Sequence, residues 1–322
     1  MRGSIYDRRF VIVGGKGGVG KSTICAALAL AAARRGKRVL IVELANKGRA
    51  HLLFEHPNEV GYEPVELHPG IDCINVTTEP ALQEYGLMKL RWKRLYRVVF
   101  ENPMMRTLVR MLPGMKELLL IGKAWYLEQE RDARTGKPRW DMLIVDAPAT
   151  GHGALVFQIP HVIMETVKSG PMLDETRQIQ QMLMDRRRTC LNIVTLPEEM
   201  PVNEALELES MTAEKLQIGL GYLFVNSIWP EVPSDNELEI LRAYRNVAMG
   251  RDERFDNVLQ TLRFMVRRRK AQMGHLTRIQ AHSSLQTVEL PYLFKEHFGL
   301  ETLEALSHQL DTGMERYESA SV

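Results

Sequence analysis

A glycine-rich segment carries the residues with the clearest chemical purpose in this chain. Residues 15–23 read GKGGVGKST and follow the apolar run Phe10–Val13 directly. Glycines let successive backbone N–H groups turn inward around phosphate oxygens, and the positive end of a following helix favours the same anion. A lysine that reaches the β- and γ-phosphates and a hydroxyl that ligates Mg²⁺ complete such a loop. The segment therefore predicts a Walker A loop that binds a nucleoside triphosphate.

The loop and the start of its helix supply most of the predicted nucleotide-binding residues. They are Gly15, Lys16, Gly17, Gly18, Val19, Gly20, Lys21, Ser22 and Thr23. Lys21 is the predicted catalytic lysine, and Ser22 is a predicted magnesium ligand. An alanine-rich helix follows and ends near Gly36, so strand, loop and helix occur in the order that the motif requires.

A second strand end predicts the other half of the metal site. Residues 141–146 read DMLIVD, an apolar run that ends in an aspartate. An aspartate at the carboxyl end of a buried strand beside the Walker A strand can hold Mg²⁺ through the water shell of the ion. Asp146 is therefore predicted to hold the metal together with Ser22.

Strand-like runs alternate with helical runs along the chain, which predicts an α/β fold. The expected strands are Phe10–Val13, Val39–Val42, Ile71–Val76, Met142–Val145, Thr189–Thr195, Gly221–Val225 and Gln286–Leu290. This alternation is typical of a doubly wound, mainly parallel sheet of the P-loop NTPase type. Residues 1–81 are the expected first part of this core, and 82–135 are a basic, methionine-rich helical subdomain inserted into it. Residues 136–322 are the second part, with a helical segment at about 160–188.

Composition excludes several other classes of protein. The net charge is +2 over 322 residues, which gives no global field for nucleic acid, and no specific nucleic-acid partner is expected. The sequence has no apolar run of about 18 residues that would predict a membrane helix. The three cysteines form no C-x-x-C pair, which suits a reducing compartment. We therefore expect a cytoplasmic protein.

The second lysine of the loop, Lys16, points to a subclass. The string GGKGGVGKST resembles the deviant Walker A loop of the signal-recognition, MinD and nitrogenase-iron-protein class of ATPases. In that class the early lysine reaches across a dimer interface to the nucleotide of the partner. The resemblance implies that Lys16 is catalytic in trans. It also implies a nucleotide-gated dimer, either a homodimer or a heterodimer with a related ATPase.

The residues after Asp146 narrow the resemblance. Residues 147–153 read APATGHG, which resembles the DTAPTGHT switch II of the arsenite-pump ATPase and of its relative that delivers tail-anchored membrane proteins. Val225-Asn226 resembles the family element whose asparagine contacts adenine, and Leu290-Pro291 resembles its C-terminal nucleotide loop. The resemblance implies an ATP-hydrolysing, magnesium-dependent ArsA-like ATPase in which Asn226 and Pro291 help to bind the nucleotide.

The first switch departs from this family. After the second strand the family carries S-T-D-P-A, whose aspartate orients the attacking water, but here that position falls on Ala45. Glu43 lies two residues earlier and is the candidate catalytic carboxylate. Either Glu43 substitutes, or hydrolysis is slow, or a partner chain supplies the competent half-site. The alternative role for Glu43 is that of a strand-end residue hydrogen-bonded to the loop.

The sequence says less about the client or partner on which such an ATPase acts. Methionines cluster around residues 104–115 and 164–184, where they either line a groove for an apolar client or membrane-protein partner, or pack the insert against the core. Two other functions remain open: a MinD- or ParA-like spatial-organising ATPase, and an ATP-binding regulatory subunit with little turnover. The PATGH string with the downstream QIP favours the ArsA-like class.

Overall fold

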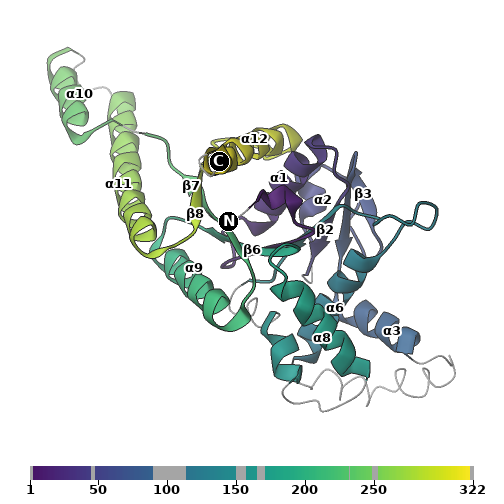
Figure 1. Cartoon of the computed structure of the whole chain (residues 1–322). Coiled ribbons are helices and arrows are strands. Elements are labelled where there is room, and N and C mark those ends of the chain that lie inside the picture. Colours follow the sequence, from purple (N-terminus) through teal and green to yellow (C-terminus); the bar gives the residue numbers. More distant parts are fainter. Residues whose placement is uncertain are drawn as a thin grey trace.

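An eight-stranded sheet forms the centre of the molecule in a computed structural model that describes residues 3–44, 48–89, 114–149, 157–164, 171–231, 233–248 and 253–319 (Figure 1). Its strand order is β3-β4-β2-β5-β1-β6-β7-β8. The strands are β1 (Phe10–Gly14), β2 (Val39–Glu43), β3 (Val65–His68), β4 (Ile71–Asn75), β5 (Met142–Asp146), β6 (Thr189–Thr195), β7 (Leu220–Ile228) and β8 (Gln286–Pro291). Seven pair in parallel, and β3 pairs antiparallel with β4. The predicted α/β, doubly wound, mainly parallel sheet is confirmed.

The strand that the sequence analysis missed, β3, lies at the edge of the sheet. It is short, only one of its four residues is buried, and its pairing with β4 is irregular between Glu66 and His68. A short edge strand with few buried residues lacks the apolar run that identified the other seven strands.

Helices cover both faces of the sheet. On one face lie α1 (Lys21–Arg34), α2 (Ala50–Leu53) and α12 (Leu300–Ser319). On the other face lie α3 (Thr78–Lys89), α6 (Met115–Gln129), α8 (Pro171–Met184) and α9 (Glu199–Met211). Short helical turns occur at Ile5–Asp7 and Thr212–Leu216. Alternate residues of each inner strand enter the two cores: Phe10 and Ile12 pack under the second group of helices, Val11 and Val13 under the first.

The helix that follows the glycine-rich loop is held tightly against the sheet. Most residues of α1 from Ile24 to Ala32 are alanine, and all are buried. Small side chains let the helix approach the strands closely. From the outside, the hydroxyl of Ser307 on α12 donates a 2.6 Å hydrogen bond to the carbonyl of Ala27. The start of α1 is therefore fixed by packing on both sides.

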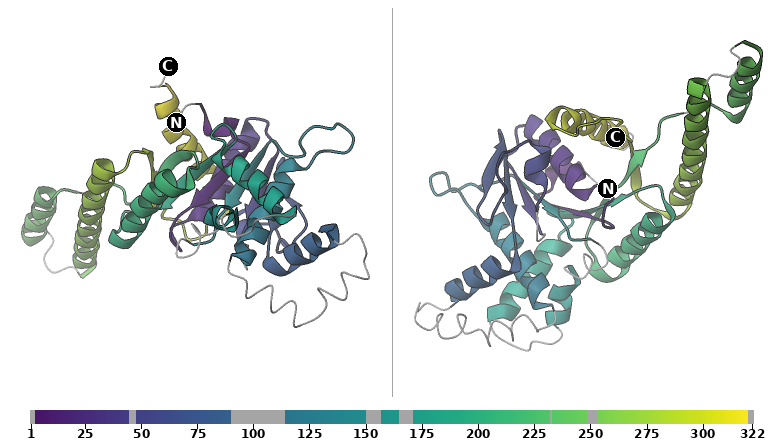
Figure 2. Two further views of the ribbon diagram at one scale, coloured as in Figure 1. Left: turned by 60° about the horizontal axis from the view of Figure 1, so that its bottom comes forward. Right: turned by 180° about the vertical axis from the view of Figure 1, so that it is seen from behind.

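A pair of helices projects from the body beyond β7 and β8 (Figure 2). These are α10 (Asp235–Ala248) and the 30-residue α11 (Glu253–His282). The C-terminal part of α11 joins the core through the buried side chains of Leu276 and Ile279. The two residues that follow α11 bind α9, because Glu209 accepts hydrogen bonds from the hydroxyls of Ser283 and Ser284.

A buried carboxylate ties the C-terminal end of α6 to the sheet. The side chain of Glu128 is 1% exposed and accepts hydrogen bonds from Arg9, just before β1, and from Arg188, just before β6. Burial acts to raise the pKa of Glu128, but the two guanidinium groups outweigh it and hold the pKa below its usual value. The anchored helix α6 therefore forms a fixed layer over the strands.

The predicted helical insert falls only partly on described residues. α3 and α6 lie at its two ends, and 90–113, with Met104, Met105 and Met111, lie outside the described residues. Within 160–188, α8 is present, and its Leu173, Met182 and Leu183 are buried in the core. For these three residues the structure shows packing against the body rather than an open groove. No helix in the described part of the chain is long and apolar enough to cross a membrane.

Candidate functional site

The carboxyl ends of three neighbouring strands bring the predicted phosphate and metal residues together. In the parallel register, Asp146 at the end of β5 lies opposite Val13 of β1 on one side and opposite Glu43 of β2 on the other. The glycine-rich loop continues directly from β1. The edge of the sheet therefore sets the loop, Asp146 and Glu43 in a row, as expected for ligand sites in open α/β sheets.

The loop passes so close to its neighbours that two positions admit only glycine. A Cβ on Gly15, whose φ is 144°, would lie 2.2 Å from the carbonyl oxygen of Val194 on β6. A Cβ on Gly20, whose φ is 97°, would lie 2.3 Å from the amide nitrogen of Asn226. Both φ values are positive and lie in a range where the backbone of a residue with a side chain is strained. Gly18 shares the positive φ, and Gly17 has a negative one.

The residues at the start of α1 meet Asp146. The hydroxyl of Ser22 donates a 2.5 Å hydrogen bond to Oδ2 of Asp146, and the buried ammonium of Lys21 donates a 2.9 Å bond to the carbonyl oxygen of Lys16. Thr23 is the next residue of the helix and is half-buried. The structure thus brings Lys21, Ser22 and Asp146 to one place.

Burial controls the charges of this group. It raises the pKa of Asp146 to about 6, although the Ser22 hydroxyl and the Lys21 charge act in the opposite direction, and the nearby Glu43 adds to the rise. Burial lowers the pKa of Lys21, which the charge of Asp146 opposes. A cation placed between Asp146 and a phosphate would favour the ionised carboxylate.

The donor set at this edge fits magnesium. Mg²⁺ prefers oxygen ligands and is usually held by one or two carboxylates or hydroxyls together with phosphate oxygens and water. Ser22 and Asp146 present a hydroxyl and a carboxylate oxygen 2.5 Å apart at the phosphate loop. These residues therefore match the requirements of a metal that bridges protein and triphosphate.

Glu43 is buried and held by the chain that follows it. Its side chain is 2% exposed, and its Oε1 accepts hydrogen bonds from the backbone N–H groups of Arg49 at 2.6 Å and Ala50 at 2.9 Å. A Cβ on Gly48 would lie 2.0 Å from Oε2. Of the two roles left open by the sequence, these contacts are those of a residue that anchors the loop. Ala45 lies outside the described residues, as do residues 150–153 of the expected second switch.

Lys16 contacts a helix of its own chain. Its ammonium forms a 2.5 Å ion pair with Glu204 of α9, and the side chain of Lys16 remains 31% exposed. Sequence reasoning did not find Glu204, because it lies 188 positions away and no motif marks it. Lys16 thus lies at the surface of the loop rather than inside it.

The two residues expected at adenine lie at the ends of adjacent strands. Asn226 of β7 donates a 3.0 Å hydrogen bond to the carbonyl of Val19, whose own side chain is buried in the core. Pro291 ends β8 opposite Ile228. The site therefore extends from the phosphate loop toward β7 and β8.

Gln272 of α11 fixes the end of β7, and it too was missed from the sequence. The buried amide of Gln272 accepts from the backbone N–H of Trp229 at 2.9 Å and donates to the carbonyl of Ser227 at 3.1 Å. The side-chain amide thereby satisfies two backbone groups at the end of β7, next to Asn226. Only the folded chain brings these residues together.

Comparison with known proteins identifies the family of the chain. The sequence profile of the anion-transporting ATPases matches residues 8–170, which include the glycine-rich loop, Glu43 and Asp146. The chain belongs to the anion-transporting ATPase family. The eight-stranded, mostly parallel sheet with flanking helices is consistent with a P-loop NTPase of this family.

Three relatives show how far the similarity extends. ATPase BagA of Mycobacterium tuberculosis is 31% identical over 226 residues, which cover 66% of this chain and 63% of BagA. The arsenical pump-driving ATPases of Acidiphilium multivorum and Escherichia coli are 26% and 25% identical, over 69% of this chain and 40% of each relative. The match thus spans less than two thirds of the length of these relatives.

The raised pKa of Asp146 predicts a specific pH dependence of stability. A carboxyl with a higher pKa in the folded than in the unfolded chain stabilises the fold below its unfolded pKa, and this contribution is lost as the pH rises through about 6. With EDTA and no nucleotide, the wild type should lose about 1–1.5 kcal/mol relative to Asp146→Asn between pH 5 and pH 7.5. Urea unfolding at the two pH values measures this difference.

The control is Asp141→Asn, which replaces a part-exposed aspartate just before the same strand. This variant should keep the pH dependence of the wild type. If wild type and Asp146→Asn change in parallel with pH, the environment described for Asp146 is wrong.

Proposed function

We propose that this chain binds ATP with Mg²⁺ at the carboxyl edge of β1, β5 and β7, hydrolyses it slowly, and works as a nucleotide-gated dimer. One observation carries the proposal: the glycine-rich loop lies against Asp146 through Ser22 on one side and against Asn226 on the other. A triphosphate laid along the loop would thus extend from the metal ligands toward the adenine residues.

In this proposal the loop residues exchange internal partners for phosphate oxygens. Lys21 would leave the carbonyl of Lys16 for the β- and γ-phosphates, while backbone N–H groups from Gly15 to Thr23 surround the triphosphate. Ser22 and Asp146 would hold the magnesium ion, which neutralises charge on the phosphate oxygens. Asn226 and Pro291 would contact the adenine.

Slow hydrolysis is proposed because the carboxylate nearest to the expected water position already has partners. Glu43 accepts two backbone hydrogen bonds, and Ala45 offers no oxygen in place of the family aspartate. The same observation supports a second candidate function, an ATP-binding regulatory subunit with little turnover. Both functions share the binding site and differ in the rate of phosphate release.

The proposed dimer depends on Lys16. The half-buried ion pair with Glu204 would break so that Lys16 reaches the nucleotide of a partner, either a second copy or a related ATPase. We propose that closure of this cytoplasmic dimer acts on a membrane-protein partner or an apolar client. The names of the relatives support such coupling, since two are described as driving an arsenical pump.

Metalloid binding is not part of the proposal. The three cysteines of the chain, Cys25, Cys73 and Cys190, are all buried, and burial raises the pKa of each thiol. A soft-metal site needs thiolates that a ligand can reach.

ATP binding should depend on Lys21. We expect Lys21→Ala to weaken ATP binding at least about 100-fold, or ~2.7 kcal/mol, because a buried ammonium beside the phosphates has no substitute in the loop. Calorimetry with Mg·ATP measures the affinity, and Lys270→Ala, which removes an exposed lysine of α11, should match the wild type. If Lys21→Ala binds Mg·ATP within about tenfold of the wild-type affinity, the proposed phosphate site is wrong.

Association should depend on nucleotide and on Lys16. With a non-hydrolysable ATP analogue, light scattering should show the wild type associating. Lys16→Ala should associate at least about tenfold more weakly while its monomer binds nucleotide within about threefold of wild type. Glu204→Gln removes the internal partner of Lys16 and should associate at least as well as wild type. If all three proteins remain monomeric when the analogue is bound, the proposed dimer is contradicted.

The two roles of Glu43 can be separated by two substitutions. Glutamine keeps an oxygen that can accept from Arg49 and Ala50, whereas alanine removes it. For a loop anchor, Glu43→Gln should retain phosphate release within about twofold, and Glu43→Ala should lose at least about tenfold. Loss of activity in the glutamine variant, with ATP binding intact, would instead assign the attacking water to Glu43.

A further inference from the structure

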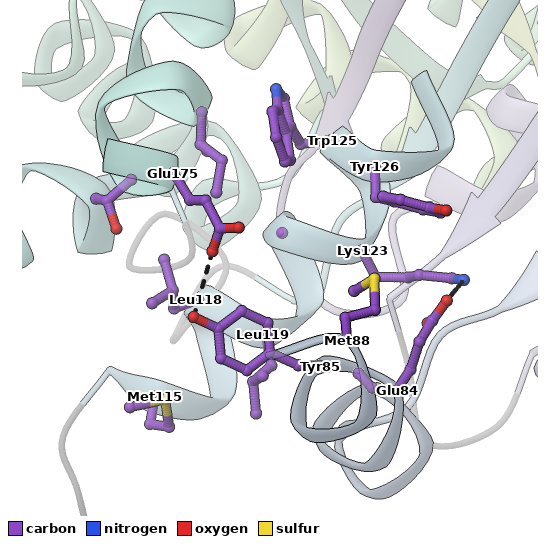
Figure 3. A pocket seen from close by; sticks show the side chains of 14 residues that line it. Glu84, Tyr85, Met88, Met115, Leu118, Leu119, Lys123, Trp125, Tyr126 and Glu175 are labelled. Atoms are coloured by element: carbon purple, nitrogen blue, oxygen red, sulfur yellow. Dashed lines mark hydrogen bonds and ion pairs between the residues drawn. The ribbon is translucent and has the colours of Figure 1, made fainter. Parts of the chain in front are cut away.

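A cavity lies between α3, α6 and α8, on the face of the sheet opposite α1 (Figure 3). Its volume is about 280 Å³, and it is partly open to solvent. None of the residues that line it belongs to the glycine-rich loop or to the ends of β2, β5, β7 and β8. The cavity is therefore a second candidate site, separate from the proposed nucleotide site.

Apolar side chains form most of the wall. Leu118, Leu119 and Ile179 form the inner side, and all three also belong to the hydrophobic core beneath the helices. Trp125 adds an aromatic surface. Packing into the core holds the inner wall in place, which favours a preformed pocket over a gap that closes when empty.

A glycine in the middle of α6 leaves part of this space open. Gly122 lines the cavity, and a Cβ built on it would meet nothing nearer than the Cδ1 atom of Ile179 at 3.9 Å. Glycine weakens a helix interior by about 1 kcal/mol relative to alanine. A larger side chain at this position would fit the helix and would occupy the cavity.

The charged groups around the cavity already have partners. Lys123 of α6 pairs with Glu84 of α3 at 2.8 Å, and Glu84 also accepts from the hydroxyl of Tyr62 at 2.6 Å. The hydroxyl of Tyr85 donates to Glu175 of α8 at 3.2 Å, and burial raises the pKa of Tyr85 to about 12, so it remains a donor. In the view of Figure 3, Met88 lies between these two contacts. A ligand would find no unpaired charge among the described lining residues.

We propose that this cavity binds a small uncharged apolar molecule with about the bulk of two fused aromatic rings or a medium-length aliphatic chain. A cavity of about 150 Å³ with apolar walls holds benzene, and this one is about twice that volume. Apolar walls hold water poorly, and the flexible side chain of Met88 can adapt to molecules of different shape. The site goes beyond the proposed function because it requires neither ATP nor a dimer.

The probe for this site is 1-aminonaphthalene, which is neutral at pH 7.5 and fluoresces more strongly in apolar surroundings. Titration into the nucleotide-free protein should show one saturable site, with a dissociation constant on the order of 10–100 µM from ligand-efficiency bounds. Trp125 lines the cavity, so excitation of tryptophan should transfer energy to the bound probe. Trp125→Phe should reduce this transfer while directly excited probe fluorescence still saturates.

Two glycine-to-leucine variants test the location. Gly122→Leu should fill the cavity and weaken binding at least tenfold. Gly274→Leu makes the same change in the exposed face of α11, where a Cβ meets nothing within 4 Å, and should bind within twofold of wild type. Because a core-facing change can disturb folding, Met88→Gln serves as a second variant. Met88 is 49% exposed, and its replacement should weaken binding at least threefold without unfolding the protein.

Competition tests the class of ligand. Octan-1-ol should displace the probe at least tenfold better than octanoate or octylammonium, because the described lining residues offer neither ion a free partner. The proposal is overturned if the probe does not saturate, or if folded Gly122→Leu and Met88→Gln bind as the wild type does. Equal displacement by octanoate and octanol overturns the uncharged class. None of these results depends on ATP binding, so each failure is distinct from failure of the proposed nucleotide site.

Discussion

The parallel register of β1, β5 and β2 is the constraint on which the rest of the candidate site depends. Because Asp146 lies opposite Val13 and Glu43, a shift of one strand by one residue would turn Asp146 to the other face of the sheet. Burial on both faces fixes that register, since each inner strand supplies side chains to both cores. The apolar packing of the sheet thus determines where the charged groups of the edge lie.

The proposed binding groups of this edge are held by contacts within the chain. Ser22 contacts Asp146, Lys21 contacts a loop carbonyl, and Lys16 contacts Glu204. In the proposed function a nucleotide would exchange some of these contacts for its own, so its affinity would reflect the difference between new and old partners. The same contacts satisfy the hydrogen-bonding groups of these side chains.

Much of this edge could be predicted from local sequence. The apolar runs identified seven strands, and the loop motif identified Lys21 and Ser22, because each pattern is set by neighbours in the chain. Strand β3 was missed because it is short and only one of its four residues is buried. Glu204 and Gln272 were missed for a different reason: their roles come from contacts with residues distant in sequence, made only when α9 and α11 pack against the sheet. The contacts of Glu43 needed the structure too, because a sequence cannot tell which backbone amides a buried carboxylate will meet.

Helix α11 is fixed near one end and extends away from the body at the other. Gln272, Leu276 and Ile279 hold its C-terminal part, and Glu209 of α9 accepts hydrogen bonds from the serines that follow the helix. Glu253 lies 19 residues before Gln272, which is about 28 Å along the helix at 1.5 Å per residue. A rotation of about 5° about Gln272 would move the far end by about 2.5 Å. A small adjustment beside the glycine-rich loop would therefore become a displacement of a few ångströms at the far end of α11.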